Sequence, residues 1–210
     1  MKFIKYIIRK IIAHFISGKV EPMKVAESQI KIAATHGFIV FQDKEFRQLI
    51  NWDKQSKVEQ DRIFNELVAT AVILLHALYL NKLPDIKKEK QEYWQQVYDC
   101  MPESFIDYLK SSGVPSEFAA MWQKVIDQRW DEYQENKNYT RQEFYDFDPG
   151  ESNHPYNELL KELVMIVETI RISSILHLTR GRAKPKDPLN RYLQKWLAQL
   201  TNRLYEEIGW

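Results

Sequence analysis

Four polar side chains interrupt one of the most apolar stretches of this sequence. Residues 162–178 read ELVMIVETIRISSILHL, and the polar positions, spaced by three, are Glu168, Arg171, Ser174 and His177. Neighbours three apart on a helix lie within contact distance, so the glutamate and the arginine can form an ion pair. Titratable groups with charged neighbours are typical of active sites. Glu168, Arg171 and His177 are therefore candidate catalytic residues.

The same spacing also has a structural explanation, which we prefer. A charge in an apolar setting needs a partner whether or not it takes part in a reaction. Under this interpretation Glu168 and Arg171 form a largely buried ion pair that neutralises a polar seam in the core. Removing one member of such a pair leaves the other charge alone, at a cost of roughly 3–5 kcal/mol.

An internal similarity adds a second histidine to this group. Residues 64–76, FNELVATAVILLH, align without gaps on residues 156–168, YNELLKELVMIVE, and share Asn-Glu-Leu after an aromatic residue. A duplication with pseudo-twofold symmetry would produce such a pattern. The alignment places His76 opposite Glu168, so His76 is a further candidate, expected to lie closer to the ion pair than His177 does.

The segment from Arg171 to His177 resembles a family pattern. It fits the loose arrangement of the all-α HEPN-type ribonucleases, an arginine followed a few residues later by a histidine. The resemblance implies an RNA-cleaving site with both side chains at a dimer interface. A polar residue usually follows the arginine in that family, whereas Ile172 follows it here. A HEPN-like ribonuclease, or another enzyme using this pair, is an alternative hypothesis.

A basic loop comes next in the sequence. Residues 179–186 contain Arg180, Arg182, Lys184 and Lys186. Such a group can bind the phosphates of nucleic acid, but the loop lacks the interleaved aromatic residues on which bases stack. Cations are also favourable at the C-terminal end of a helix. We predict a solvated loop, with nucleic acid as an alternative partner.

The sequence predicts neither a metal nor a cofactor. A di-iron bundle needs a Glu-x-x-His motif on each of two helices, and residues 151–154 supply the single example. The lone cysteine, Cys100, excludes thiolate zinc cages and an internal disulfide. The glycine-rich loops that bind nucleotide phosphates are absent as well.

The composition is that of a folded soluble protein. The 210 residues are 44% hydrophobic and 28% charged, and this length suits one domain covering residues 1–210. The formal charge of +1 gives no sign of a polyanionic partner for the molecule as a whole. A single cysteine fits a reducing compartment, so we predict a cytoplasmic protein.

Helical periodicity and helix-start signals cover nearly the whole chain. Capping boxes at residues 56–59 and 140–143 each predict the start of a helix. Prolines that can begin a helix are Pro84, Pro102, Pro115, Pro155 and Pro188. Residues 37–41, GFIVF, predict either a short strand or a bend between helices. Together these signals predict an all-α protein of about eight to ten helices.

Two of the predicted helices, at about residues 56–80 and 155–179, are apolar on nearly every side. Helices of this kind are buried centrally or span a membrane. The apolar run of the first is shorter than the roughly 20 residues that span a bilayer, and charges and serines interrupt the second. The sequence therefore predicts a bundle-like domain around two buried central helices.

Residues 1–18 predict a basic amphipathic helix. They contain lysine and arginine but no acid, and one face carries Ile4, Ile8, Ile11 and Phe15. We expect this face to pack on the body of the protein or on a second subunit. The alternative is a peripheral membrane protein in which residues 2–16 lie on an anionic membrane surface.

Deleting residues 1–18 should lower the melting temperature or the solubility, because removing a packed helix exposes the apolar surface beneath it. A thermal melt and a solubility assay check this expectation. An unchanged melt combined with lost binding to anionic vesicles would instead favour the membrane alternative.

The expected function follows from the missing catalytic signature. We predict a helical binding or interaction module for a protein partner, rather than a catalyst. Six tryptophans, eleven tyrosines and the apolar face of residues 1–18 also suggest a homodimer, which is the commonest closed assembly.

Overall fold

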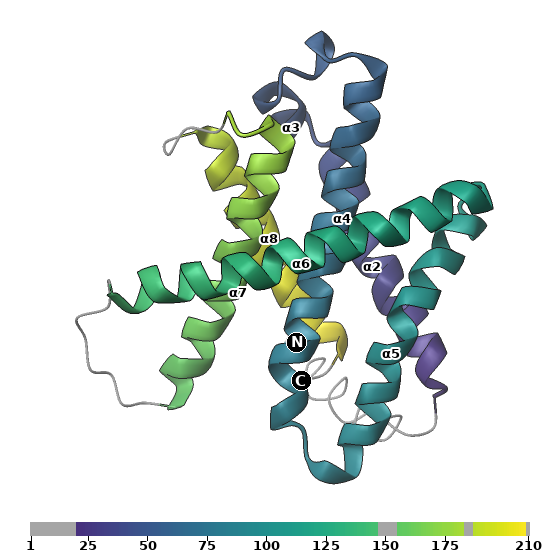
Figure 1. Ribbon diagram of the computed structural model, residues 1–210, viewed down its shortest axis with the longest axis vertical. Helices are drawn as coiled ribbons and strands as arrows, with labels where there is room; N and C mark the ends of the chain where they lie inside the picture. Colours follow the sequence, from purple (N-terminus) through teal and green to yellow (C-terminus); the bar gives the residue numbers. More distant parts are fainter. Residues whose placement is uncertain (1–19, 147–154, 183–186, 209–210) are drawn as a thin grey trace, which may run out of the picture.

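The computed structural model describes residues 20–146, 155–182 and 187–208 (Figure 1). This part of the chain contains seven α-helices, two short 3-10 helices and no strand, which confirms the all-α prediction. The elements in chain order are α2 (Pro22–Gln42), α3 (Lys44–Leu49), η1 (Trp52–Lys54), α4 (Lys57–Lys82), η2 (Leu83–Asp85), α5 (Lys88–Ser111), α6 (Ser116–Asp146), α7 (Pro155–Thr179) and α8 (Pro188–Ile208). The helix predicted over residues 1–18 lies outside the described residues.

The core is built around α4. Every residue from Glu66 to Leu75 is buried, because α2, α6, α7 and α8 all pack against this helix. Within the described ranges, α4 with η2 is also the one segment long and apolar enough to cross a membrane. Its most apolar window is 78% buried inside the protein, as expected for the central helix of a folded core.

The second predicted central helix, α7, is buried on part of its circumference. Met165, Ile166 and Ile170 face the interior and are at most 2% exposed. Val164, Ile172 and Leu176 are 38%, 37% and 44% exposed, because α4, α6 and α8 cover the other sides of the helix. The apolar residues all round α7 therefore do not make it a central helix.

Several predicted helix breaks are absent from the structure. Residues 37–41 form neither a strand nor a bend but continue α2. Pro102 lies inside α5, and the capping box at residues 140–143 lies inside α6. Thr140 is buried there rather than capping a new helix. Tertiary packing of α5 against α2, and of α6 against α4 and α7, outweighs these local signals. The described residues therefore form fewer and longer helices than expected.

Other local signals correctly predict where helices begin. The Ser56 hydroxyl accepts a hydrogen bond from the Glu59 backbone N–H at 3.2 Å, as the capping box requires. The Asp187 carboxylate accepts one from the Leu189 backbone N–H at 3.0 Å and caps α8. Pro155 and Pro188 are the first residues of α7 and α8, where a missing N–H has no cost.

A close approach between two helices occurs at Gly37. A Cβ atom at this position would lie 3.1 Å from the backbone oxygen of Leu67 and 3.1 Å from Cα of Val68. Gly37 and its neighbours Ala33 and Ala34 are buried. Small side chains on α2 therefore let its backbone pack directly on α4.

Candidate functional site

The predicted ion pair between Glu168 and Arg171 is confirmed. The Oε2 atom of Glu168 lies 2.6 Å from Nη2 and 3.0 Å from Nε of Arg171. Arg171 also donates to the side-chain oxygen of Asn190, and Glu168 accepts from Gln194 at 3.1 Å. The two charged side chains are 17% and 19% exposed and face α8. The pair is not sealed in the core, so losing one member should cost less than the 3–5 kcal/mol of a fully buried pair.

His177 points away from that pair, toward α6. Its Nε2 atom lies 2.6 Å from Oε2 of Glu132. Glu132 also accepts a hydrogen bond from Arg129 at 3.0 Å, and Arg129 forms a two-pronged pair with Glu66 of α4 at 2.6 and 3.0 Å. His177 therefore ends a chain of charges that links α4, α6 and α7.

The structure does not bring the four candidate residues together. α4 and α7 meet through the hydroxyls of Thr70 and Ser174, which are 2.8 Å apart. His76 lies instead against Tyr98 of α5 and Trp130 of α6. It belongs to a different set of contacts from the Glu168–Arg171 pair, so the expected cluster of His76 with that pair is not observed. Arg171 and His177, the ribonuclease-like pair, likewise contact different helices.

The environment of His76 makes the stability of the protein depend on pH. Burial lowers the pKa of His76 from 6.5 to about 4, with a smaller opposing effect of Asp127. Between pH 6.5 and about 4, His76 is protonated in the unfolded chain but stays neutral in the folded protein. The free energy of unfolding therefore falls as the pH falls through this range. We expect a loss of about 2 kcal/mol from this group between pH 7 and pH 5. Urea titrations at several pH values should show this slope, and the variant His76→Phe should reduce it.

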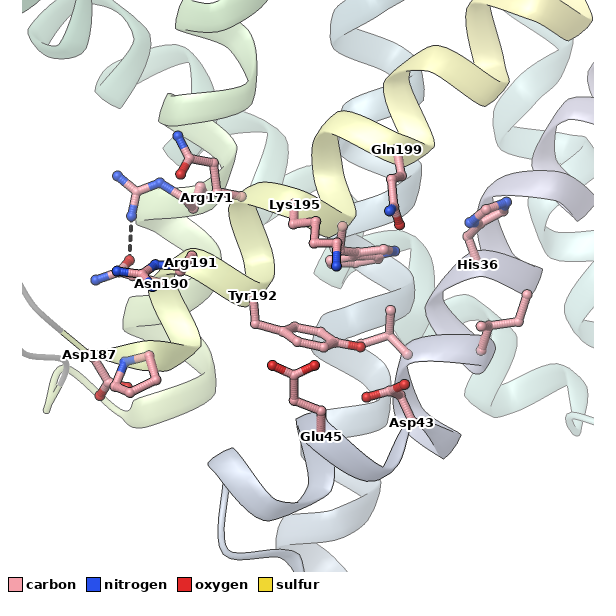
Figure 2. Close-up of a pocket in the computed structure, with 15 residues that line it drawn as sticks. His36, Asp43, Glu45, Arg171, Asp187, Asn190, Arg191, Tyr192, Lys195 and Gln199 are labelled. Carbon is pink, nitrogen blue, oxygen red and sulfur yellow. Dashed lines mark hydrogen bonds between the residues drawn. The ribbon is translucent and has the colours of Figure 1, made fainter.

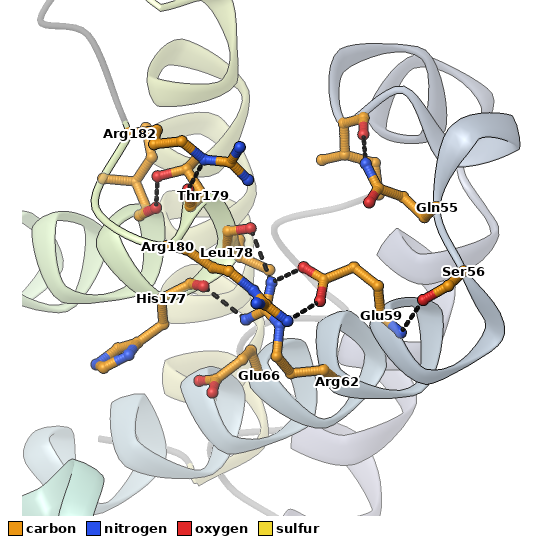
Figure 3. A network of polar contacts seen from close by, with 12 residues as sticks. Gln55, Ser56, Glu59, Arg62, Glu66, His177, Leu178, Thr179, Arg180 and Arg182 are labelled. Carbon is orange, nitrogen blue, oxygen red and sulfur yellow. Dashed lines mark hydrogen bonds and ion pairs between the residues drawn. The ribbon is translucent and has the colours of Figure 1, made fainter.

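The basic loop is partly used to hold the end of α7 (Figure 3). Arg62 of α4 donates to the backbone oxygens of His177 and Leu178 at 2.6 and 3.1 Å. Glu59 binds both Arg62 and Arg180, each at 2.5 Å. These arginines, with Arg62 foremost, lower the pKa of Glu59 to about 2 against the opposing effect of its burial.

This arrangement weakens the case for a phosphate-binding loop. Arg180 is held by the Glu59 carboxylate that it shares with Arg62, and Arg182 donates to the backbone oxygen of Thr179 at 3.2 Å. Arg180 and Gly181 adopt positive φ angles of 53° and 72°, and the Gly181 N–H bonds to the Leu176 oxygen at 2.8 Å. The loop therefore ends α7 in a left-handed turn. Lys184 and Lys186 lie outside the described residues.

A wide groove between α8 and the α2–α3 corner was not expected from the sequence. Its volume is about 1020 Å³. Figure 2 shows Tyr192 reaching from α8 toward Asp43 and Glu45 on the opposite wall. The groove is lined by His36, Ile39, Val40, Asp43, Glu45, Arg171, Asp187, Pro188, Asn190, Arg191, Tyr192, Gln194, Lys195, Trp196 and Gln199. We name it the α8 groove.

The α8 wall of the groove offers hydrogen-bond donors that the rest of the described protein does not use. The side chains of Arg191 and Lys195 form no ion pair or hydrogen bond with another described residue. The Trp196 side chain is 5% exposed, and its Nε1 atom is buried without a partner in the described chain. A buried donor that lacks a partner costs stability, so such a group often indicates a missing ligand or water.

The opposite wall of the groove is acidic, and the ring of Tyr192 reaches toward it from α8. Asp43 caps α3 by accepting from the Phe46 N–H at 2.9 Å. Burial, reinforced by the nearby carboxylates of Asp43 and Glu45, raises the pKa of Tyr192, so its hydroxyl remains protonated. Burial and Arg203 lower the pKa of His36. The groove therefore combines a basic wall on α8 with an acidic corner.

The sequence carried a weak signal for this groove. Leu193, Trp196, Leu197, Leu200 and Leu204 of α8 are buried, as their helical spacing indicates. The polar face of α8, which carries Arg191 and Lys195, has the pattern of an ordinary solvated surface. Which element stands opposite that face depends on packing between residues far apart in the chain.

Metal binding has no support among the described residues, where no group of three or more His, Cys, Asp or Glu side chains could hold an ion. Comparison with models of protein families, with curated proteins and with solved structures found no match for this chain.

Proposed function

We propose that the protein is a helical interaction module that binds an acidic segment of a partner protein in the α8 groove. Arg191 and Lys195 supply two positive charges that pair with no other side chain in the described part of the chain, and complementary charges favour association and steer it. The groove volume of about 1020 Å³ lies at the upper end of the range for small-molecule sites. That size suits several residues of a peptide.

The observation that carries this proposal is a Trp196 indole N–H in the same groove as the Arg191 and Lys195 cations, all three without a side-chain partner among the residues that the structure describes. The Trp196 indole, the Arg191 guanidinium and the Lys195 ammonium group are all hydrogen-bond donors, and the last two are positively charged. A peptide offers carboxylates and backbone carbonyls as acceptors. Trp, Tyr and Arg are also the residue types that contribute most to binding at protein interfaces. Tyr192, Trp196 and Arg191 bring all three types into one groove.

Charge reversal on α8 tests the proposal. Fluorescence anisotropy with a labelled ten-residue poly-glutamate peptide should detect binding that weakens as salt is raised. Replacing both Arg191→Glu and Lys195→Glu should weaken this binding by about tenfold or more, since attraction becomes repulsion. Lys124→Glu, at an exposed position on α6, is the matched control and should change the affinity little. Equal binding by the double variant and by the wild type would refute the proposal.

The expected homodimer is part of the same proposal. Val164, Ile172 and Leu176 form an exposed apolar strip along α7, and such strips are often covered in assemblies. We expect light scattering at high concentration to give twice the mass of the 25.2 kDa chain. Ile172→Glu should shift the mass toward the monomer, and a wild-type mass of one chain would contradict the dimer.

A further inference from the structure

A second cavity, separate from the α8 groove, lies between α4, α5 and α6. Its volume is about 180 Å³. The residues that line it are Val72, His76, Tyr98, Pro102, Phe105, Gln123, Ile126, Asp127 and Trp130. A cavity of roughly 150 Å³ in another protein holds one benzene molecule, so this one has room for a single small organic molecule.

The cavity has an apolar floor and aromatic walls. Val72, Phe105 and Ile126 are at most 5% exposed and are the most buried of its lining residues, so we call them its floor. The half-buried rings of Tyr98 and Trp130 both contact His76, with centroids 5.4 and 6.0 Å from the imidazole. Tyrosine and tryptophan faces attract cations as well as apolar groups.

The mouth of the cavity carries its charge. Asp127 and Pro102 are exposed, and Gln123 donates to Oδ1 of Asp127 at 2.8 Å. His76 is neutral at pH 7 because burial lowers its pKa to about 4. Asp127 is therefore the one charged side chain among the lining residues, and the cavity has a negative entrance.

Pro102 adds a backbone acceptor at the same place. It lies inside α5 and has no N–H, so the Tyr98 oxygen four residues earlier loses its α-helical donor. Tyr98 and Pro102 both line the cavity. The Asp127 carboxylate at the entrance accepts hydrogen bonds from a positively charged donor, and Tyr98, another lining residue, has a backbone oxygen without its regular α-helical donor.

We propose that this cavity binds a small organic ammonium ion with one aromatic or branched aliphatic group. The apolar group occupies the floor formed by Val72, Phe105 and Ile126, and the ammonium group lies at the mouth beside Asp127. There it meets the carboxylate and the faces of Tyr98 and Trp130, while the neutral His76 does not repel it. This inference is independent of the α8 groove, because no residue lines both sites.

Three probes of nearly equal shape separate the role of charge from that of size. Benzylammonium, benzyl alcohol and benzoate can each be titrated into the full-length protein and followed by calorimetry and by the indole N–H NMR signal of Trp130. That signal is assigned with the variant Trp130→Phe. We expect benzylammonium to bind most tightly, benzyl alcohol more weakly and benzoate weakest, with the Trp130 signal shifting on binding. Equal affinities for the three probes, or no binding of benzylammonium at millimolar concentration, would overturn the proposal.

A conservative variant at the mouth provides the second arm. Asp127→Asn should weaken benzylammonium binding by about threefold to tenfold and leave benzyl alcohol unchanged, because it removes the charge at nearly constant shape. Asp131→Asn, at an exposed position one turn further along α6, is the control and should leave both affinities unchanged. A loss of benzylammonium affinity as large in Asp131→Asn as in Asp127→Asn would show that general surface charge, and not this cavity, attracts the ion.

Discussion

Arg129→Ala should destabilise the protein by roughly 2–4 kcal/mol, somewhat below the 3–5 kcal/mol measured when one member of a fully buried ion pair is removed. Arg129 and Glu66 are 20% and 10% exposed and are joined by two hydrogen bonds. The alanine variant would leave the Glu66 carboxylate without its partner inside the α4–α6 contact. For a chain of this size we expect the melting temperature to fall by about 4–16 °C.

Two further variants distinguish a buried pair from a general loss of contacts. The double variant Glu66→Met with Arg129→Leu should cost much less than Arg129→Ala, because no lone charge remains. The control is Lys57→Ala, which removes an exposed ion pair on α4, the helix that carries Glu66. The side chains of this pair, Lys57 and Asp61, are 78% and 58% exposed. It should cost less than about 0.5 kcal/mol. A melt of Arg129→Ala within a degree or two of the wild type would contradict the prediction.

Gly37→Val should destabilise the protein by about 3 kcal/mol, because the new side chain has no space. Its Cβ alone would stand 3.1 Å from the backbone of Leu67 and Val68. Backbone atoms of a central helix cannot rotate away as a side-chain end can, so α2 must move off α4. Gly37→Ala should cost less, about 1 kcal/mol, since the better helix propensity of alanine offsets part of the clash.

The control for this prediction introduces the same residue into the same helix. Thr35 is exposed on α2, so Thr35→Val should change the free energy of unfolding by no more than about 0.5 kcal/mol. Urea titration of the three variants measures the difference. If Gly37→Val were as stable as Thr35→Val, the close packing of α2 on α4 at Gly37 would be contradicted.

Features determined by nearby residues were predictable from the sequence. The Ser56 cap, the start of α8 at Pro188 and the Glu168–Arg171 pair each involve residues no more than three apart. Such interactions depend mainly on helix geometry. They were predicted correctly because few tertiary contacts are needed to form them.

Features that depend on which helices meet were not predictable in the same way. The partners of His177 and Arg129, Glu132 and Glu66, are 45 and 63 residues away along the chain. Nothing in the spacing of residues 162–178 indicates that His177 faces α6 while Arg171 faces α8. Pro102 predicts a helix start because a proline destabilises the interior of a helix. In the structure α5 nevertheless continues through Pro102.

The α8 groove and the cavity between α4, α5 and α6 could not be predicted from the sequence for a related reason. Each is lined by helices from separate parts of the chain. The sequence around each lining residue is that of an ordinary core or surface position. Asp127 looks like a solvated charge, and Trp130 looks like a member of an apolar stripe. Their combination with His76 and Tyr98 becomes visible when the three helices are placed together.

The contacts of α4 also determine the order in which the protein can complete its core during synthesis. The backbone oxygen of His177 that receives Arg62 belongs to a residue made 115 positions later. At about 5–20 residues per second, this delay is roughly 6–23 s. α2 precedes α4, so it can cover one side at once, while the side that meets α7 waits. During that time the one helix of the described chain that is long and apolar enough to cross a membrane has an uncovered face, and a chaperone that binds apolar segments would have its target there.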